Sequence, residues 1–268
     1  MFFKDLDYNH ERIEPFRIFG NLYFVGSHFG LTHLIDTGDG LILIDTGIRP
    51  TLFMLIDSIR KMGFDPADIR YIVHSHGHFD HTGGTFALKT LYGAKIFLGA
   101  EDALMVQGKE DDLAADFGYP PTEPFTPDVL LYDGSRIQLG NTEISCIHTP
   151  GHSPGVMSLF FDVTDGRNTY RAGMLGGAGL GAMFPPYSDS AERRQRFIDG
   201  LERLKSEHVD IHLGNHAHDN NMLHKRDIST PENNAFVDIS GQSWIQFLDY
   251  VLAELKKQIA SRASGNKE

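Results

Sequence analysis

One stretch decides how the rest of this 268-residue chain is interpreted: His74-Ser75-His76-Gly77-His78-Phe79-Asp80-His81-Thr82-Gly83-Gly84. It begins at the end of the apolar run 70–74, which is predicted to be a buried strand. Its core is an H-x-H-x-D-H pattern made by His76, His78, Asp80 and His81. Imidazoles and a carboxylate are the donors that zinc and other borderline divalent ions bind. The stretch therefore predicts a metal site in a loop at the end of a strand.

The spacing of these side chains suits more than one ion. Alternate residues of an extended chain point to the same side, so His76 and His78 can bind one ion. Asp80 and His81 follow in the turn and can reach toward a second ion. One ion would need one further protein ligand, and two ions would need at least two.

Two other histidine clusters supply candidates for those ligands. His152 lies in the turn-rich loop 149–155 after a predicted strand, and His216 follows the predicted strand 209–215. His218 competes with His216, which we favour. Three unrelated groups of surface histidines would be the alternative, but all three clusters follow predicted strands, which favours a shared metal site.

Several polar residues inside predicted strands suit supporting roles. His74 and His148 precede the ligand loops, and we expect them to be hydrogen-bonded core or second-shell histidines, whereas His212 looks like a strand residue. Asp45 ends the apolar run 41–44, where an unpaired carboxylate would be costly to bury. We expect it to accept a hydrogen bond from a ligand histidine and fix that ring's tautomer. The alternative is an aspartate that merely forms the turn.

The order of predicted elements indicates an α/β layered fold in a single domain. The strand 70–74, the helix 85–93 and the strand 94–98 predict a βαβ element. A second strand-rich half, 129–173, precedes helices at 190–206 and in the C-terminal region, without a linker. The apolar stripe of the last helix favours packing on the chain's own core over a dimer seam. We predict one domain over 1–268, with an ordered core at 14–262 and a disordered tail at 263–268.

The composition limits which classes of partner we expect the protein to bind. The chain carries 24 Lys and Arg against 36 Asp and Glu, a net charge of −12, which argues against nucleic acid and anionic membranes and favours a small-molecule substrate. The single cysteine, Cys146, excludes an internal disulfide and a multi-cysteine metal site. The N-terminal residues show no signal peptide and no apolar run spans a membrane, so we expect a cytoplasmic protein, with a homo-oligomer left open.

The H-x-H-x-D-H pattern, the upstream Leu43-Ile44-Asp45-Thr46-Gly47 and the downstream Thr149-Pro150-Gly151-His152-Ser153-Pro154-Gly155 resemble the metallo-β-lactamase superfamily. The resemblance runs from about residue 14 to the C-terminal helix and is strongest to the third, histidine-rich subclass of metallo-β-lactamases. It implies an αββα sandwich of two mixed sheets flanked by helices, with Asp45 as the buried second-shell aspartate. It also implies two zinc ions, the first bound by His76, His78 and His152 and the second by Asp80, His81 and His216.

The segment 171–176 departs from most of that superfamily. It lacks the bridging aspartate of hydroxyacylglutathione hydrolases, quorum-signal lactonases and tRNA-processing nucleases, and the third subclass lacks it too. However, Met174 and Gly176 stand where that subclass carries serines that bind the β-lactam carboxylate. Loss of both hydroxyls weakens the case for β-lactams as substrates.

The expected activity is zinc-dependent hydrolysis of a small cyclic amide or ester, β-lactamase-like, in which Asp80 holds the attacking water and takes its proton. One alternative is a metal-dependent hydrolase of an unrelated small ester, lactone or thioester without β-lactamase activity. Another is a redox di-iron protein on the same fold, which the histidine-rich donors disfavour. Five apolar residues either wall the substrate pocket or pack under their own loops: Phe117, Tyr119, Met183, Phe184 and Tyr187.

Overall fold

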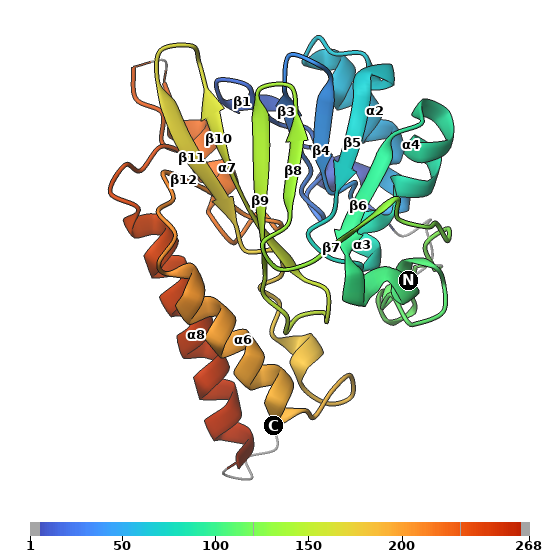
Figure 1. The fold of residues 1–268 in the computed structure, drawn as a ribbon, viewed down its shortest axis with the longest axis vertical. Helices are drawn as coiled ribbons and strands as arrows, with labels where there is room; N and C mark the ends of the chain where they lie inside the picture. The colour runs from blue at the N-terminus through green and yellow to red at the C-terminus, as the bar shows by residue number, and fades with distance from the viewer. Residues whose placement is uncertain (1–5, 120, 231, 264–268) are drawn as a thin grey trace.

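The computed structural model describes residues 6–119, 121–230 and 232–263, and within them two β-sheets lie between two layers of helices (Figure 1). The first sheet has seven strands in the order of the chain. These are β1 (Phe16–Phe19), β2 (Leu22–Phe24), β3 (His33–Asp36), β4 (Leu41–Ile44), β5 (Ile69–Val73), β6 (Lys95–Gly99) and β7 (Val129–Leu131). Strands β1 to β4 pair antiparallel and β4 to β7 pair parallel, so the sheet is mixed.

The second sheet has five strands in the order β12-β11-β10-β9-β8. They are β8 (Arg136–Leu139), β9 (Thr142–His148), β10 (Met157–Thr164), β11 (Thr169–Met174) and β12 (Ile211–Leu213). Only the β11–β12 pair is parallel, so this sheet is mixed as well. The predicted αββα sandwich of two mixed sheets is confirmed.

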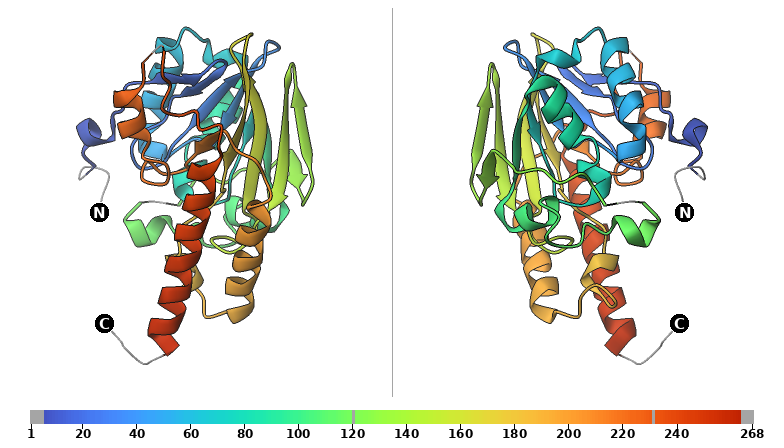
Figure 2. Two further views of the ribbon diagram at one scale, coloured as in Figure 1. Left: turned by 90° about the vertical axis from the view of Figure 1, so that its left-hand side faces the viewer. Right: turned by 90° about the vertical axis from the view of Figure 1, so that its right-hand side faces the viewer.

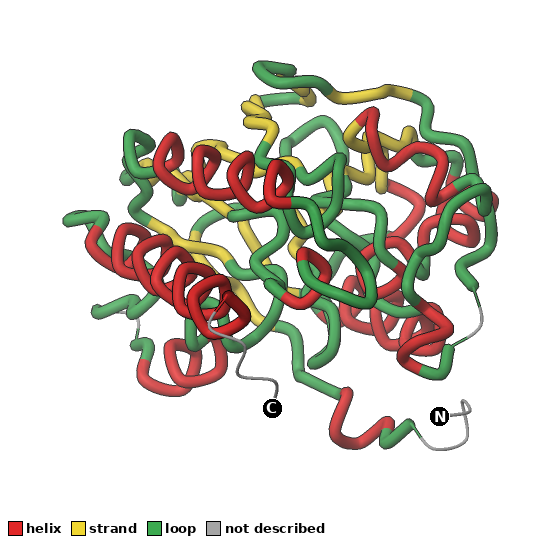
Figure 3. Tube along the Cα trace, turned by 90° about the horizontal axis from the view of Figure 1, so that it is seen from below, coloured by secondary structure: helices red, strands yellow, loops and turns green. Residues whose placement is uncertain are grey.

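Helices cover the outer face of each sheet. On the first sheet these are α2 (Leu52–Lys61) and α4 (Thr85–Tyr92), and on the second α6 (Ala191–Leu204) and α8 (Gln242–Ala263). Figures 1 and 2 show α6 and α8 running together past the ends of the strands, and Figure 3 shows strands between the two helical sides. The shorter helices are α1 (Tyr8–Glu11), α3 (Phe79–Thr82), α5 (Ala103–Val106) and α7 (Met222–Ile228). Short 3-10 turns are η2 (Arg49–Thr51), η3 (Pro66–Asp68), η4 (Ala100–Asp102), η5 (Ala114–Phe117) and η6 (Gly181–Met183).

The predicted βαβ element is present as β5, α4 and β6. Strands β5 and β6 pair parallel, and α4 crosses between them on the outer face. The helix ends at Gly93, whose φ of 71° is left-handed and favours glycine. This element carries the histidine-rich stretch in the connection after β5, at the end of a buried strand.

The C-terminal helix packs on the chain's own core, as the sequence favoured. Trp244 and Leu248 of α8 are fully buried with Phe197 of α6 and Phe160 of β10, and the Trp244 indole donates a hydrogen bond to the Leu204 carbonyl (3.1 Å). The apolar stripe therefore packs on the chain's own core. Of the tail predicted to be disordered, 263–268, all residues after Ala263 lie outside the described residues. Among those residues, no helix is long and apolar enough to cross a bilayer.

Topology brings five loops to one edge of the sandwich. These loops follow β4 and β5, which run parallel in the first sheet, and β9, β11 and β12, which run in one direction in the second. Because each histidine cluster follows one of these strands, segments far apart in sequence meet at this edge. The edge therefore positions the candidate site.

Candidate metal centre

The first group of candidate ligands contains His76, His78 and His152. Their donor atoms all lie within 4.8 Å of one another, and His78 Nδ1 lies 2.9 Å from His152 Nε2. His76 and His78 come from the loop after β5 in the first sheet, and His152 comes from the loop after β9 in the second. The two sheets therefore each contribute to this group.

The second group contains Asp80, His81 and His216. Asp80 and His81 lie in α3, a single helical turn, rather than in an irregular turn as expected. Asp80 Oδ2 lies 3.3 Å from His81 Nε2 and 3.6 Å from His216 Nε2. His76 joins the two groups, because its donor atom also lies within 4.8 Å of those of Asp80 and His81.

Four of the imidazoles are oriented through the nitrogen that faces away from the cluster. Backbone carbonyls of Gly176, Gly179 and Phe29 lie 2.8 Å, 2.7 Å and 2.8 Å from the Nδ1 atoms of His76, His152 and His216 respectively. Because a carbonyl only accepts, each Nδ1 carries the proton and each Nε2 offers a lone pair inward. The fourth ring, His81, is oriented by a carboxylate.

Asp45 is that carboxylate. Its Oδ2 accepts from His81 Nδ1 (2.9 Å) and from the Ser75 hydroxyl (2.7 Å), and its Oδ1 accepts from the Ser75 amide (2.8 Å). Burial alone would raise the pKa of Asp45, but His81 and His74 hold it well below the usual range. Asp45 also has a left-handed φ of 61°, so it turns the chain and holds the histidine at once.

The electrostatics of the cluster suit a cation. Burial lowers the pKa of His76 and His78 well below the ordinary value and that of His152 to about 4, so these rings are neutral. Burial opposes ionisation of Asp80, but His81 lowers its pKa and keeps it charged. Burial also opposes protonation of His81, yet Asp80 and Asp45 raise its pKa to about 10.

Two buried atoms of the cluster lack a hydrogen-bond partner among the described residues. They are His76 Nε2 and His81 Nε2, both in fully buried rings; the contact of His81 Nε2 with Asp80 Oδ2 at 3.3 Å is an ion pair with another candidate ligand. An unpaired polar atom in a dry interior is unfavourable. A metal ion between these nitrogens would satisfy them, so the residues present fit a bound metal.

Asp102, at the end of η4, ties the two ligand loops together and was not predicted. Its Oδ2 accepts from the Gly77 amide (2.8 Å) and the Ser153 hydroxyl (2.6 Å), and its Oδ1 accepts from the Gly155 amide (2.6 Å). The side chain is fully buried, and burial raises its pKa against these hydrogen bonds. Nothing local in the sequence distinguishes it from a surface acid.

Arg193 and the glycine-rich segment 176–181 (the glycine segment) contact the His152 loop. The Arg193 guanidinium donates to the carbonyls of Gly151 (2.5 Å) and His152 (2.6 Å). A Cβ at Gly177 or Gly179 would lie 2.9 Å or 2.8 Å from the His152 ring. The absence of side chains at these glycines therefore lets the backbone approach the His152 ring closely.

The remaining histidines fall into the expected classes. His218 is 84% exposed and lies 3.4 Å from Asp219, whereas His216 faces Asp80. His74 Nε2 is paired with the Thr85 hydroxyl (2.9 Å), and His148 Nε2 donates to the Pro154 carbonyl (2.8 Å). His212 is buried in β12 against Trp244 and Phe247.

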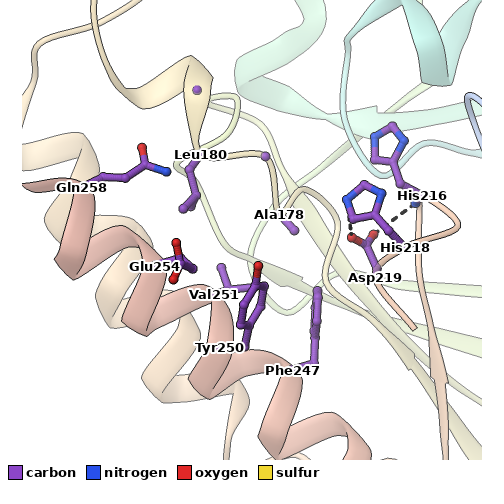
Figure 4. A pocket seen from close by; sticks show the side chains of 12 residues that line it. Ala178, Leu180, His216, His218, Asp219, Phe247, Tyr250, Val251, Glu254 and Gln258 are labelled. Atoms are coloured by element: carbon purple, nitrogen blue, oxygen red, sulfur yellow. Dashed lines mark hydrogen bonds and ion pairs between the residues drawn. The ribbon is translucent and has the colours of Figure 1, made fainter. Parts of the chain in front are cut away.

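A cavity of about 450 Å³ opens beside His216. Figure 4 shows its walls: Ala178 and Leu180 from the glycine segment, and Phe247 and Tyr250 from α8. A second cavity of about 490 Å³ is lined by His28, Phe29, His216 and neighbouring residues. Among the described residues that line either cavity, none is lysine or arginine.

None of the five apolar residues expected as pocket walls lines either cavity. Met183 and Phe184 are buried in the core with α6 and α8. Phe117 and Tyr119 pack around Phe29 and Phe79. Tyr187 is 43% exposed. Met183 and Phe184 therefore wall neither cavity and instead pack in the core with α6 and α8.

The fold is an αββα sandwich, and the histidine-rich cluster at its edge has the donor set of a metal site. The family model described as "Metallo-beta-lactamase superfamily" matches residues 25–165, more than half of the chain, and the chain belongs to this superfamily.

Solved structures of subclass B3 metallo-beta-lactamases are similar to the chain over almost its whole length. BJP-1 of Bradyrhizobium japonicum is 27% identical with a TM-score of 0.86, covering 96% of this chain and 98% of that one. FEZ-1 of Legionella gormanii is 29% identical with a TM-score of 0.84, covering 94% and 97%. The predicted likeness to the third subclass is thus confirmed.

The curated relatives include a lactonase. The N-acyl homoserine lactonase AiiA of Bacillus thuringiensis subsp. kurstaki is 27% identical over 158 residues, which cover 48% of this chain and 57% of that protein. The chain spans about half the length of the curated relatives it matches.

Proposed function

We propose that the protein is a zinc-dependent hydrolase that acts on a small cyclic amide or ester. The observation that carries the proposal is the convergence of six donor side chains from both sheets on one point of the sandwich edge. His76, His78 and His152 would hold one zinc ion, and Asp80, His81 and His216 a second. Because both sheets supply ligands, we also propose that the chain works as a single domain.

When bound, zinc ions supply an acidified water and polarise the substrate carbonyl. The protein's own groups do the rest. Asp80 is ionised and belongs to the second group, which His76 joins to the first, so its carboxylate could hold the attacking water and accept its proton. Asp45 and the carbonyls of Gly176, Gly179 and Phe29 keep the imidazoles in one orientation, which limits reorganisation during the reaction.

Two candidate substrate classes follow from the cavity. A β-lactam carries a carboxylate, and the described lining offers His218, Asp219 and Glu254 but no lysine or arginine to bind it. A neutral lactone with an apolar substituent needs no such partner and suits the wall of Phe247 and Tyr250. Lactone hydrolysis without β-lactamase activity is therefore the second candidate, and the likeness to a lactonase supports it.

The redox di-iron alternative fits less well. Apart from Asp80, the proposed ligands are all imidazoles, and the residues after β11 are Leu175, Gly176 and Gly177 rather than a carboxylate. Imidazole-rich donor sets without a bridging carboxylate favour zinc over a di-iron centre.

The test is turnover of a chromogenic cephalosporin and of an N-acyl homoserine lactone by zinc-loaded full-length protein. We expect chelator-sensitive hydrolysis of at least one, lost in His152→Ala and kept in the surface control His208→Gln. Cephalosporin turnover would select the first candidate, and turnover of the lactone alone the second. Absence of chelator-sensitive turnover of both, with zinc bound, would overturn the proposal.

A further inference from the structure

A separate group of metal-ligating side chains lies outside the central cluster. It consists of His10 and Glu11 from α1 and His28 from the loop between β2 and β3. One donor atom from each lies within 4.8 Å of the other two. The His10 and His28 rings have centroids 4.4 Å apart, and His10 Nδ1 lies 3.9 Å from Glu11 Oε1, beyond hydrogen-bond distance.

The backbone holds these three residues together. The His28 amide donates to the Glu11 carbonyl (3.0 Å), and the Phe29 amide donates to Glu11 Oε2 (2.9 Å). Asp7 caps α1 by accepting from the amides of Asn9 (3.0 Å) and His10 (3.3 Å). The ligands therefore come from two segments whose relative position is already fixed, which lowers the entropic cost of binding an ion.

The donor set has the chemistry of a zinc site. Two imidazoles and one carboxylate form a known three-ligand set for zinc, with the fourth position left to water. Glu11 is only 5% exposed, and its Oε2 is committed to Phe29, so Oε1 is the oxygen turned toward His10. The neighbouring Arg12 pairs with Asp57 (3.5 Å) instead. The positive charge that best complements this carboxylate and both imidazoles is a divalent ion.

We propose that His10, Glu11 and His28 bind a further zinc ion that fastens α1 to the loop between β2 and β3. The inference does not depend on the proposed function. The site adjoins the central cluster, because the amide of Phe29 is held by Glu11 while its carbonyl holds His216 Nδ1 (2.8 Å). His28 and Phe29 also line the second cavity beside His216. An ion here would brace one wall of that cavity.

The experiment counts zinc ions bound per full-length chain after equilibrium dialysis against zinc alone. The double variant His10→Gln/His28→Gln is compared with the wild type and with His208→Gln, which removes an exposed histidine paired with Asp210. We expect the double variant to bind one ion fewer than the wild type and His208→Gln to bind the same number. Equal zinc content in the double variant and the wild type would overturn the proposal.

The measurement separates this site from the central one. His152→Ala should lower the zinc content on its own, and adding the double substitution should lower it by one more ion. A central cluster that binds no zinc would sink the proposed function and leave this difference intact. If the double variant fails to fold by circular dichroism, His10→Gln alone replaces it, because the His10 side chain is 62% exposed. Unchanged zinc content in that folded single variant would equally refute the site.

Discussion

Replacing Asp102 with alanine tests whether the ligand loops depend on a carboxylate that binds no metal. The substitution leaves three buried donors without their acceptor: the amides of Gly77 and Gly155 and the hydroxyl of Ser153. A stranded buried donor costs about 1–3 kcal/mol, so the gross loss is about 3–9 kcal/mol. Water entering the vacated polar space offsets part of it. We expect the free energy of unfolding to fall by about 4 kcal/mol, which is large for one substitution.

Thermal unfolding of metal-free protein is the appropriate assay, because a bound metal would add its own stabilisation. At roughly 2–4 °C per kcal/mol for a chain of this size, Asp102→Ala should lower the Tm by about 8–16 °C. Asp102→Asn keeps the shape and one acceptor but turns an amide donor toward other donors, so its loss should be smaller, about 2 kcal/mol.

Asp57→Asn is the matched control. Asp57 is exposed and pairs with Arg12 (3.5 Å) and Lys61 (3.3 Å), and exposed ion pairs contribute at most about 1 kcal/mol. Because Asp102 joins the His76 and His78 loop to the His152 loop, Asp102→Ala should also weaken zinc binding. A Tm and zinc content matching those of the control would refute the inference that this carboxylate organises the centre.

Three further predictions concern the histidines. His152→Ala should lose activity together with one zinc ion, while the exposed His208→Gln should keep both; metal analysis and kinetics compare them. Zinc loading at neutral pH should release at least one proton per chain, because Asp80 and Asp45 raise the pKa of His81 against burial to about 10 and the ligand must be neutral. Apparent zinc affinity should accordingly rise with pH up to about that value, and calorimetry in buffers of different ionisation enthalpy measures the release. Burial lowers the pKa of His212 to about 3. Below about pH 6.5 the His212 imidazole is therefore protonated in the unfolded chain but not in the folded one, so the free energy of unfolding falls as the pH drops toward 3. Between pH 7 and 4.5, His212→Phe should therefore lose about 2–3 kcal/mol less stability than the wild type in denaturant titrations.

Local patterns predicted an α/β layered fold and named the candidate ligands, whereas the αββα sandwich and the division of the ligands between two ions came from the family resemblance. Short apolar runs bounded by turn residues marked β4, β5, β9 and β12, and the candidate ligands stand a few residues beyond them. These features are predictable because a buried strand and a metal-binding motif each depend on residues that are neighbours in the sequence. The sequence favoured His216 over His218, and in the structure His216 faces Asp80 whereas His218 is exposed.

Contacts between distant segments were not predictable. Asp102 and Arg193 hold the His152 loop from η4 and α6, and each looks locally like an ordinary surface charge. The cavity wall was missed for the same reason. One stripe of α8 packs on the core through Trp244, and the adjoining positions Phe247 and Tyr250 reach the cavity only because α8 lies beside the loop after β12.

The end of β11 and the segment after it affect both the candidate metal ligands and the choice of substrate. Met174 is fully buried, and a Cβ at Gly176 would lie 2.1 Å from the Met157 carbonyl oxygen, so serines cannot simply be restored at these two positions. The same backbone orients His76 and packs against His152, so moving it to admit a hydroxyl would disturb two candidate ligands. Under the proposed function, substrate selection would depend on the wall of α8, where Phe247 and Tyr250 offer aromatic surface and the described lining has no lysine or arginine. An aromatic wall without lysine or arginine favours substrates recognised by an apolar substituent over substrates recognised by a carboxylate.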